Sequence, residues 1–223
     1  MREMLETGST GGAWASQPNA ENRCQQGPSF GLSIRTFFQH PMMVGSAFPA
    51  SQWLVRHMLA PLDWQKMKLL VEFGPGTGVF TRAALALLPA DATLLALDTS
   101  PAFIDHIRAS IQDQRLQAVC APAVKIATLI KDRGLPLADC ILSGLPFSTL
   151  DPMEAERTVA ASRTILGPKG IFCAYQMRRT IEPLLTKHIG GVRSAYEWRN
   201  IPPCHLYWAE TANPQVSNNG EKR

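Results

Sequence analysis

The sequence predicts an α/β fold built on a mostly parallel sheet, with helices on both faces and an antiparallel C-terminal edge strand. Two patterns carry this prediction. From about residue 63, short apolar runs alternate with segments of helical spacing, which is typical of parallel strands joined by crossover helices. The last two apolar runs, 191–198 and 204–209, have no helical segment between them, so we expect them to pair antiparallel.

Five apolar runs of strand length precede that closing pair. They lie near residues 68–73, 92–97, 116–120, 138–143 and 170–176. In the intervening and following segments, apolar residues recur at helical spacing, which predicts helices near residues 79–88, 101–113, 123–132, 152–166 and 179–188. We expect each helix to connect one strand to the next.

The segment ahead of the first strand, residues 28–62, is expected to form a helical cap. Phe30, Ile34, Phe37 and Phe38 fall on one side of a helix that ends before Pro41, and a second helix is expected at 51–59. The aromatic stripe has two interpretations. It is either a helix that covers the core of the domain or a helix that lies in a membrane interface.

Length and charge limit the classes of protein to consider. With 223 residues and 45% hydrophobic content, the chain can bury one substantial core. Its formal net charge of +4 falls short of the dense basic stripes of dedicated nucleic-acid binders, so we do not expect a nucleic-acid partner. Its five cysteines are far apart and include no C-x-x-C pair, so we expect no metal site.

The sequence also gives an expectation for localisation. No apolar run approaches the roughly 20 residues of a membrane span, and residues 1–27 lack the apolar core of a secretory signal. We therefore expect a cytoplasmic protein, with attachment to a membrane surface left open. Residues 1–27 and 211–223 are polar and lack a hydrophobic period, and we expect a disordered tail and a flexible tail there.

The first apolar run ends in a glycine-rich turn that indicates a ligand site. Gly74, Gly76 and Gly78 alternate in the stretch LLVEFGPGTG, so the backbone can turn sharply, and a ligand can approach both it and the N-terminus of the next helix. An ordinary tight turn would also explain the glycines alone. However, the second apolar run ends in Asp98, twenty positions after Gly78, where an acid that binds ribose hydroxyls is expected.

The charge around this turn favours a cationic ligand over a dinucleotide. Glu72 stands two positions before Gly74, where its carboxylate would repel a pyrophosphate. Pro75 removes a backbone donor from the turn. S-adenosylmethionine carries a sulfonium and an ammonium and has no phosphate, so it suits an acid at this position.

The stretches VEFGPGTG and ALDTS, together with the terminal strand pair, resemble class I S-adenosylmethionine-dependent methyltransferases. The resemblance implies a Rossmann-like sheet, S-adenosylmethionine as the cofactor and a methyltransferase domain over residues 63–210. The loop at 120–123 lacks the acid that reads adenine in many members. Carried onto matching positions, the resemblance implies donor-binding roles for Glu72, Phe73, Gly74, Gly76, Gly78, Asp98, Thr99 and Ser143.

The segment SGLPF, from Ser143 to Phe147, resembles the N-L-P-Y or N-P-P-Y motif of amino-group methyltransferases. The resemblance implies that it faces the transferable methyl group. Gly144 stands where that motif has Asn, and loss of this acceptor disfavours a planar exocyclic amine such as that of adenine. An alkyl amine remains compatible, and a simple strand-to-helix turn is the alternative interpretation.

Two further stretches, 38–51 and 197–203, resemble bacterial phospholipid N-methyltransferases. This resemblance implies stepwise methylation of phosphatidylethanolamine to phosphatidylcholine on the inner face of the cytoplasmic membrane, with the region from Phe30 to His40 as a peripheral attachment. Tyr175 and Glu197 are candidate catalytic residues on a proton path. The implied substrate-binding residues are Gly144, Leu145, Pro146, Phe147, Trp198 and Arg199.

Three other functions fit the sequence less well. They are ornithine-lipid N-methylation, adenine N-methylation of rRNA, and a non-catalytic role at the membrane surface on the same fold. The rRNA reaction is disfavoured by Gly144 and by the modest basicity. The sequence makes no prediction of oligomeric state.

Overall fold

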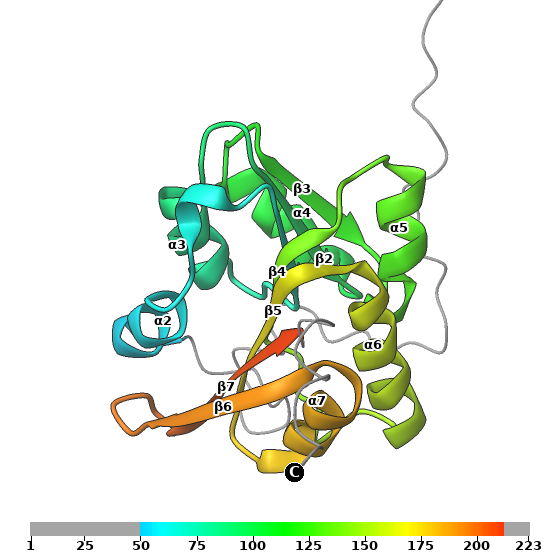
Figure 1. The fold of residues 1–223 in the computed structure, drawn as a ribbon. Coiled ribbons are helices and arrows are strands. Elements are labelled where there is room, and N and C mark those ends of the chain that lie inside the picture. The colour runs from blue at the N-terminus through cyan, green and yellow to red at the C-terminus, as the bar shows by residue number, and fades with distance from the viewer. Residues whose placement is uncertain (1–49, 212–223) are drawn as a thin grey trace, which may run out of the picture.

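A computed structural model of the chain describes residues 50–211. A seven-stranded sheet in the order β3-β2-β1-β4-β5-β7-β6 forms its centre (Figure 1). The predicted N-terminal tail, the helix predicted around residues 30–40 and nearly all of the predicted C-terminal tail lie outside the described residues. The strands are β1 Leu69–Phe73, β2 Thr93–Asp98, β3 Leu116–Cys120, β4 Ala138–Ser143, β5 Leu166–Gln176, β6 Gly190–Glu197 and β7 Cys204–Thr211.

The mostly parallel sheet and its antiparallel C-terminal pair are confirmed. Strands β1 to β5 pair in parallel, and β7 pairs antiparallel with both β5 and β6. One detail differs from the prediction, because the antiparallel strand β7 lies inside the sheet and β6 forms the edge. Burial accounts for this order. β7 contains the buried Leu206, Tyr207 and Trp208, whereas β6 is largely exposed or half-buried.

All the predicted helices from residue 50 onward are present. The helices expected near 123–132 and 179–188 each begin with a short 3-10 turn, at Ala123–Lys125 and Arg179–Ile181. β5 begins at Leu166, earlier than predicted, directly where the preceding helix ends. The α-helices are α2 Gln52–Leu59, α3 Val79–Leu87, α4 Pro101–Ser110, α5 Ile126–Asp132, α6 Pro152–Ile165 and α7 Glu182–His188, and a further 3-10 turn covers Trp64–Lys66.

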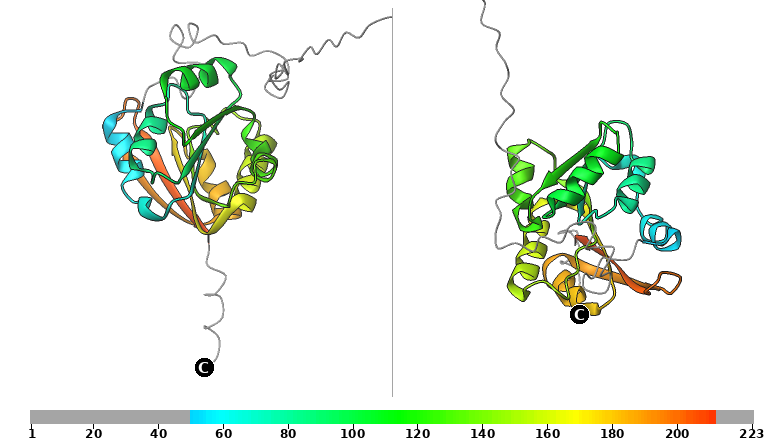
Figure 2. Two further views of the ribbon diagram at one scale, coloured as in Figure 1. Left: turned by 90° about the horizontal axis from the view of Figure 1, so that it is seen from above. Right: turned by 180° about the vertical axis from the view of Figure 1, so that it is seen from behind.

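Helices cover both faces of the sheet, as predicted (Figure 2). On one face, α5, α6 and α7 bury residues such as Ile126, Val159 and Leu185 against the strands. On the other face, α2 and α3 bury a second cluster that includes Met58. The indole Nε1 of Trp208 donates to the Met58 carbonyl over 3.0 Å, which connects α2 to β7. Within residues 50–211, no helix has the length and apolarity needed to cross a membrane.

The order of the strands predicts a crevice at the carboxyl ends of β1 and β4. The chain moves outward from β1 through β2 to β3, and then returns to the other side of β1 as β4. Ligands of open α/β sheets bind where the strand order reverses in this way. Backbone hydrogen bonds join the end of β1 to both of its neighbours: Gly74 N donates to the Leu97 carbonyl of β2 (2.8 Å), and Gly144 N, which directly follows β4, donates to the Phe73 carbonyl (2.9 Å).

Candidate functional site

The glycine turn forms one wall of the crevice. Gly74, Gly76 and Gly78 all have positive φ, at 69°, 53° and 80°. Residues other than glycine rarely adopt this backbone conformation. At Gly78, a Cβ atom would lie 2.6 Å from Cδ1 of Ile107, so a side chain there would require the Ile107 side chain of α4 to shift. At Gly76, a Cβ atom would meet no heavy atom within 4 Å. The turn therefore leaves open space beside Gly76 for a ligand.

Glu72 lies at the base of this space. Its carboxylate is 3% exposed, and Oε2 accepts a hydrogen bond from Thr81 Oγ1 over 2.7 Å. Burial raises the pKa of Glu72 to about 7, although the Thr81 hydrogen bond opposes the shift. Among residues 50–211, no Lys, Arg or His forms an ion pair with Glu72. A cationic ligand would therefore lower the pKa of this carboxyl group and gain from its negative charge.

Asp98 lies across the crevice at the end of β2. Oδ1 of Asp98 accepts from Ser100 N over 2.8 Å. Burial raises the pKa of Asp98 to about 6, while hydrogen bonds from the backbone N–H groups of Ser100, Gly76 and Thr99 oppose the shift. Asp98 thus links the glycine turn to the end of β2, and its carboxylate can accept from the two hydroxyls of a ribose. These groups fit the predicted cationic, ribose-containing donor.

The other predicted donor-binding residues lie in three different environments. Ser143 is buried at the end of β4, directly beside Phe73 in the sheet register. Thr99 is exposed and directly follows Asp98. The Phe73 side chain instead packs in the core against Phe172, with ring centroids 6.5 Å apart. Because the ring points into the core, the predicted role of Phe73 in donor binding would have to come from its backbone.

A pocket adjoins the crevice at the carboxyl ends of β4 and β5. Predicted residues Gly144, Leu145, Pro146 and Tyr175 all line it, so the SGLPF segment and the end of β5 meet as expected. The pocket is completed by residues that the sequence analysis did not single out, which are Leu54, Ser148, Gln176, Met177, Asn200, Pro202 and Cys204.

Three predicted substrate-binding residues do not line this pocket. The Phe147 ring is 1% exposed and belongs to the core on the α5 and α6 face. Trp198, the first residue of the β6–β7 loop, is 70% exposed, and the Arg199 side chain turns toward Glu197. The loop does reach the pocket, but through Asn200 and Pro202. A sequence motif could place the loop, but not the side chains that face inward.

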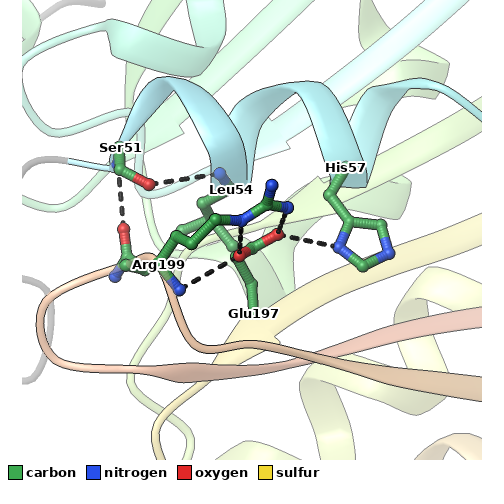
Figure 3. A network of polar contacts seen from close by, with 6 residues as sticks. Ser51, Leu54, His57, Glu197 and Arg199 are labelled. Atoms are coloured by element: carbon green, nitrogen blue, oxygen red, sulfur yellow. Dashed lines mark hydrogen bonds and ion pairs between the residues drawn. The ribbon is translucent and has the colours of Figure 1, made fainter.

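Glu197 joins the β6–β7 loop to α2 (Figure 3). Its carboxylate is 1% exposed and accepts from Arg199 Nε over 2.7 Å and from Arg199 Nη2 over 2.8 Å, and His57 Nδ1 lies 3.0 Å from Oε2. Ser51 N donates to Asn200 Oδ1 over 2.9 Å. We refer to these five residues, Ser51, His57, Glu197, Arg199 and Asn200, as the clasp.

The clasp does not suit Glu197 to the predicted role of a proton acceptor. The Arg199 guanidinium lowers the pKa of Glu197 to about 2, so this carboxylate is a weak base at neutral pH. Its side chain also contacts α2 and does not line the pocket. The geometry therefore assigns Glu197 to holding the loop against α2.

Tyr175 lies in the pocket, but its chemistry differs from that of a base. Its ring stacks on Phe80, with centroids 4.9 Å apart. Burial, followed by the nearby carboxylate of Glu72, raises the pKa of Tyr175 well above its usual range. The hydroxyl therefore stays protonated at neutral pH, where it can orient a substrate by hydrogen bonding but does not remove a proton as a phenolate.

No protein-family model matches the chain. The ornithine lipid N-methyltransferase of Singulisphaera acidiphila is 28% identical over 182 residues, which cover 80% of this chain and 94% of that protein. The ribosomal RNA small subunit methyltransferase H of Nitrosomonas eutropha is 33% identical over 104 residues, covering 47% of this chain but only 32% of that protein.

A solved structure shares the fold. Human methyltransferase-like protein 13, in complex with S-adenosylhomocysteine, superposes with a TM-score of 0.59 at 14% identity, over 74% of this chain and 85% of that one. S-adenosylmethionine is the cofactor that fits the crevice between Glu72, Gly76 and Asp98. The strand order, this crevice and the relatives together identify the chain as a class I S-adenosylmethionine-dependent methyltransferase.

Proposed function

We propose that this methyltransferase acts on the amine of a lipid head group, with ornithine lipid as the first candidate and phosphatidylethanolamine as the second. The observation that carries the proposal is the likeness to an ornithine lipid N-methyltransferase over 94% of that protein. The likeness to an rRNA methyltransferase covers only a third of that relative. This order reverses the preference for phosphatidylethanolamine that the sequence analysis expects.

The division of the site into a crevice and a pocket supports this reaction. The bound cofactor supplies a methyl group on a sulfonium centre. Glu72 and Asp98 would hold the cationic end and the ribose hydroxyls, and the pocket at Gly144 and Tyr175 would hold the amine. Alignment of two reactants in this way can contribute up to about 7–11 kcal/mol to the lowering of the barrier. Because neither Tyr175 nor Glu197 suits the role of base, the proton would leave to water.

An apolar groove between α2 and α3 would accommodate an acyl chain of such a substrate. Leu54 of α2 lines the pocket, and the adjacent Val55 lines the groove, so the two sites flank one helix. Val79, the first residue after Gly78, lies at the groove as well. Arg56 would meet an acidic group of the lipid. The remaining groove residues are Gln52, Leu59, Ala60, Trp64, Ala83 and Leu87.

Attachment to the inner membrane surface remains part of the proposal. The aromatic segment from Phe30 to His40 would supply it, and this segment lies outside the described residues. Deletion of residues 1–40 is expected to abolish co-sedimentation with vesicles while leaving donor binding intact. Vesicle binding that survives the deletion would show that another surface makes the attachment.

One experiment tests the proposed reaction directly. The full chain is incubated with S-adenosylmethionine labelled in the methyl group and, separately, with vesicles that contain ornithine lipid, vesicles that contain phosphatidylethanolamine, and rRNA. We expect label in lipid, with ornithine lipid ahead. Label in RNA alone would contradict the proposal, and failure to bind the donor would favour a non-catalytic protein on the same fold.

A further inference from the structure

Gln176, the last residue of β5, forms hydrogen bonds with backbone groups of the SGLPF turn. Gln176 is buried, and its Nε2 donates to the Leu145 carbonyl over 2.7 Å while its Oε1 accepts from Phe147 N over 3.3 Å. Phe147 N also lies 2.9 Å from the Leu145 carbonyl. This carbonyl oxygen has two lone pairs, and both have a partner within the protein. It is therefore closed to a hydrogen bond from a substrate amine.

The neighbouring residue, Tyr175, fills the space beside Gly144. A Cβ atom on Gly144 would lie 2.4 Å from the Tyr175 hydroxyl oxygen and 3.0 Å from the Gly74 carbonyl oxygen. The hydroxyl therefore occupies the volume into which any side chain at position 144 would project. Tyr175 can occupy this position because residue 144 is glycine and has no side chain.

Most of the other polar groups of the pocket are already bonded. Asn200 Oδ1 accepts from Ser51 N, and Asn200 Nδ2 donates to the Pro202 carbonyl over 2.7 Å. Cys204 Sγ lies 3.4 Å from the same amide nitrogen. The Tyr175 hydroxyl, in contrast, forms no hydrogen bond with another of residues 50–211. A planar amine on an aromatic ring has two N–H donors in one plane and needs two acceptors in that plane. Two hydroxyls line the pocket, but Ser148 is an exposed residue, and the Tyr175 hydroxyl is the one that lies beside Gly144.

We propose that Tyr175 and Gln176 make the site selective for a tetrahedral alkyl amine over a planar ring amine. Tyr175 accepts one N–H of the amine and directs the nitrogen lone pair toward the methyl group. Gln176 is a positioning residue that engages the Leu145 carbonyl and fixes the turn in which Gly144 lies. The inference rests on the proposed function and deepens it by identifying the residues that select the amine.

The reaction step balances without a base from the protein. The lone pair of the neutral amine forms a bond to the methyl carbon, the carbon–sulfur bond breaks, and its electron pair stays on sulfur. The resulting ammonium then loses a proton to water. The raised pKa of Tyr175 keeps its hydroxyl protonated throughout, so its contribution is orientation of the amine.

The first test replaces each residue in the full chain and measures lipid methylation, donor affinity and label in an adenine-containing oligoribonucleotide. We expect Tyr175→Phe to lower kcat on ornithine-lipid vesicles about ten-fold, the size of one lost hydrogen bond, with KM and the donor Kd unchanged. We expect Gln176→Leu to lower kcat similarly and to raise the ratio of RNA label to lipid label. Matched controls are Tyr196→Phe, on the exposed part of β6, and Gln112→Leu, beyond the end of α4.

The outcomes separate the inference from the proposed function. A wild-type chain that leaves lipid unlabelled would show that the proposed function has failed. A wild-type chain that labels lipid, with both variants at wild-type rate and selectivity, would overturn the inference alone. Equal label in lipid and RNA by the wild-type chain would also overturn it.

A pH profile of Gln176→Glu distinguishes positioning from general destabilisation. A protonated carboxyl group can donate to the Leu145 carbonyl and accept from Phe147 N, as the amide does, whereas an ionised one can only accept. We expect the activity of this variant, relative to wild type, to fall as pH rises through the pKa of the new carboxyl group. A constant ratio across pH, with activity equal to that of Gln176→Leu, would overturn the positioning role.

Discussion

The donor crevice and the pocket that we assign to the amine lie side by side but are built differently. The crevice comes from one continuous stretch, in which Glu72, the glycine turn and Asp98 fall on two consecutive strands and one loop. The pocket combines α2, the turn after β4, the end of β5 and the β6–β7 loop. The crevice contains the Glu72 carboxylate, which forms no ion pair with a Lys, Arg or His of residues 50–211, and open space beside Gly76, whereas the polar groups of the pocket are mostly bonded within the protein.

This difference separates the two tasks of the enzyme. A donor shared by many methyltransferases can be held by groups that a short motif fixes, because strand, turn and helix dictate where each group lies. The proposed amine substrate would be selected by shape and by the acceptors that are left free, and these depend on contacts between distant segments. The pocket is therefore where related chains of this fold can differ in substrate while keeping the same crevice.

We expect the largest effect from a substitution that disrupts the pocket and leaves most of the crevice intact. In Gly144→Asn, the new side chain would collide with the Tyr175 hydroxyl, which lies 2.4 Å from the Cβ position. We expect lipid methylation to fall about 100-fold, because a displacement near 1 Å of aligned groups costs about that much. Initial rates with labelled donor measure this change.

A double variant provides the control. Gly144→Asn combined with Tyr175→Ala removes the collision, so we expect a more stable protein than either the single Asn variant or a variant with a bulkier residue at position 144. The contact of 3.0 Å with the Gly74 carbonyl remains, and donor affinity is expected to fall less than ten-fold in both. Wild-type turnover in the single variant would show that Tyr175 moves aside freely.

Sequence reasoning succeeded where structure is local. The strand that contains Glu72, the glycine turn and Asp98 all lie where the pattern predicts, because side-chain period and backbone conformation fix them within a few residues. It failed for Phe147 and Arg199, whose directions depend on which neighbours compete for them. Thr81, Gln176 and His57 were missed. A polar residue at the end of an apolar strand was a usable signal for Gln176, but its partners, 29 to 31 residues away, cannot be read from spacing.

The second prediction sharpens the view that the crevice is built for a cation. Glu72 has a pKa raised to about 7 in the free protein, so below that pH it must lose a proton before it can stabilise a cationic donor. Donor affinity should therefore rise with pH up to about 7 and then level off. Between pH 5.5 and 8 we expect a change of about 30-fold, measured as Kd by calorimetry.

The matched variant for this prediction is Glu72→Gln. The amide retains an acceptor for Thr81 but cannot ionise, so its donor affinity should be weaker at pH 8 and nearly flat across the same range. Asp98, with its pKa near 6, would leave a smaller slope of the same sign. An unchanged pH dependence in Glu72→Gln would assign the titration to another group.

A third, smaller effect concerns the groove that we assign to an acyl chain. Ala83 lines the groove, while Ala86 on the same helix is exposed and does not. Ala83→Glu should raise KM for long-chain ornithine lipid about ten-fold, the equivalent of two methylene groups left unburied. Ala86→Glu should leave KM unchanged. Equal effects of the two variants, or none from Ala83→Glu, would remove the groove from substrate binding.

The smallest effect on activity is expected at the clasp, which holds the β6–β7 loop against α2. Glu197→Gln removes a buried charge opposite Arg199 and His57. Since both partners are partly exposed, we expect a loss of only about 1–2 kcal/mol, well below the cost of breaking a fully buried pair. For a chain of this size, that loss corresponds to about 3–6 °C in Tm, while kcat at 25 °C should change little.

The pH dependence of stability distinguishes the clasp from an ordinary surface ion pair. Glu197 has a folded-state pKa near 2, below its usual 4.5, so its stabilisation is complete above pH 4.5 and is lost as pH falls toward 2. Glu197→Gln should remove this part of the acid sensitivity. Glu182→Gln, which breaks the exposed pair with Arg179, should leave it in place. If Glu197→Gln instead abolished methylation without lowering Tm, the carboxylate would act in the pocket, and the separation between a selecting pocket and a supporting clasp would be wrong.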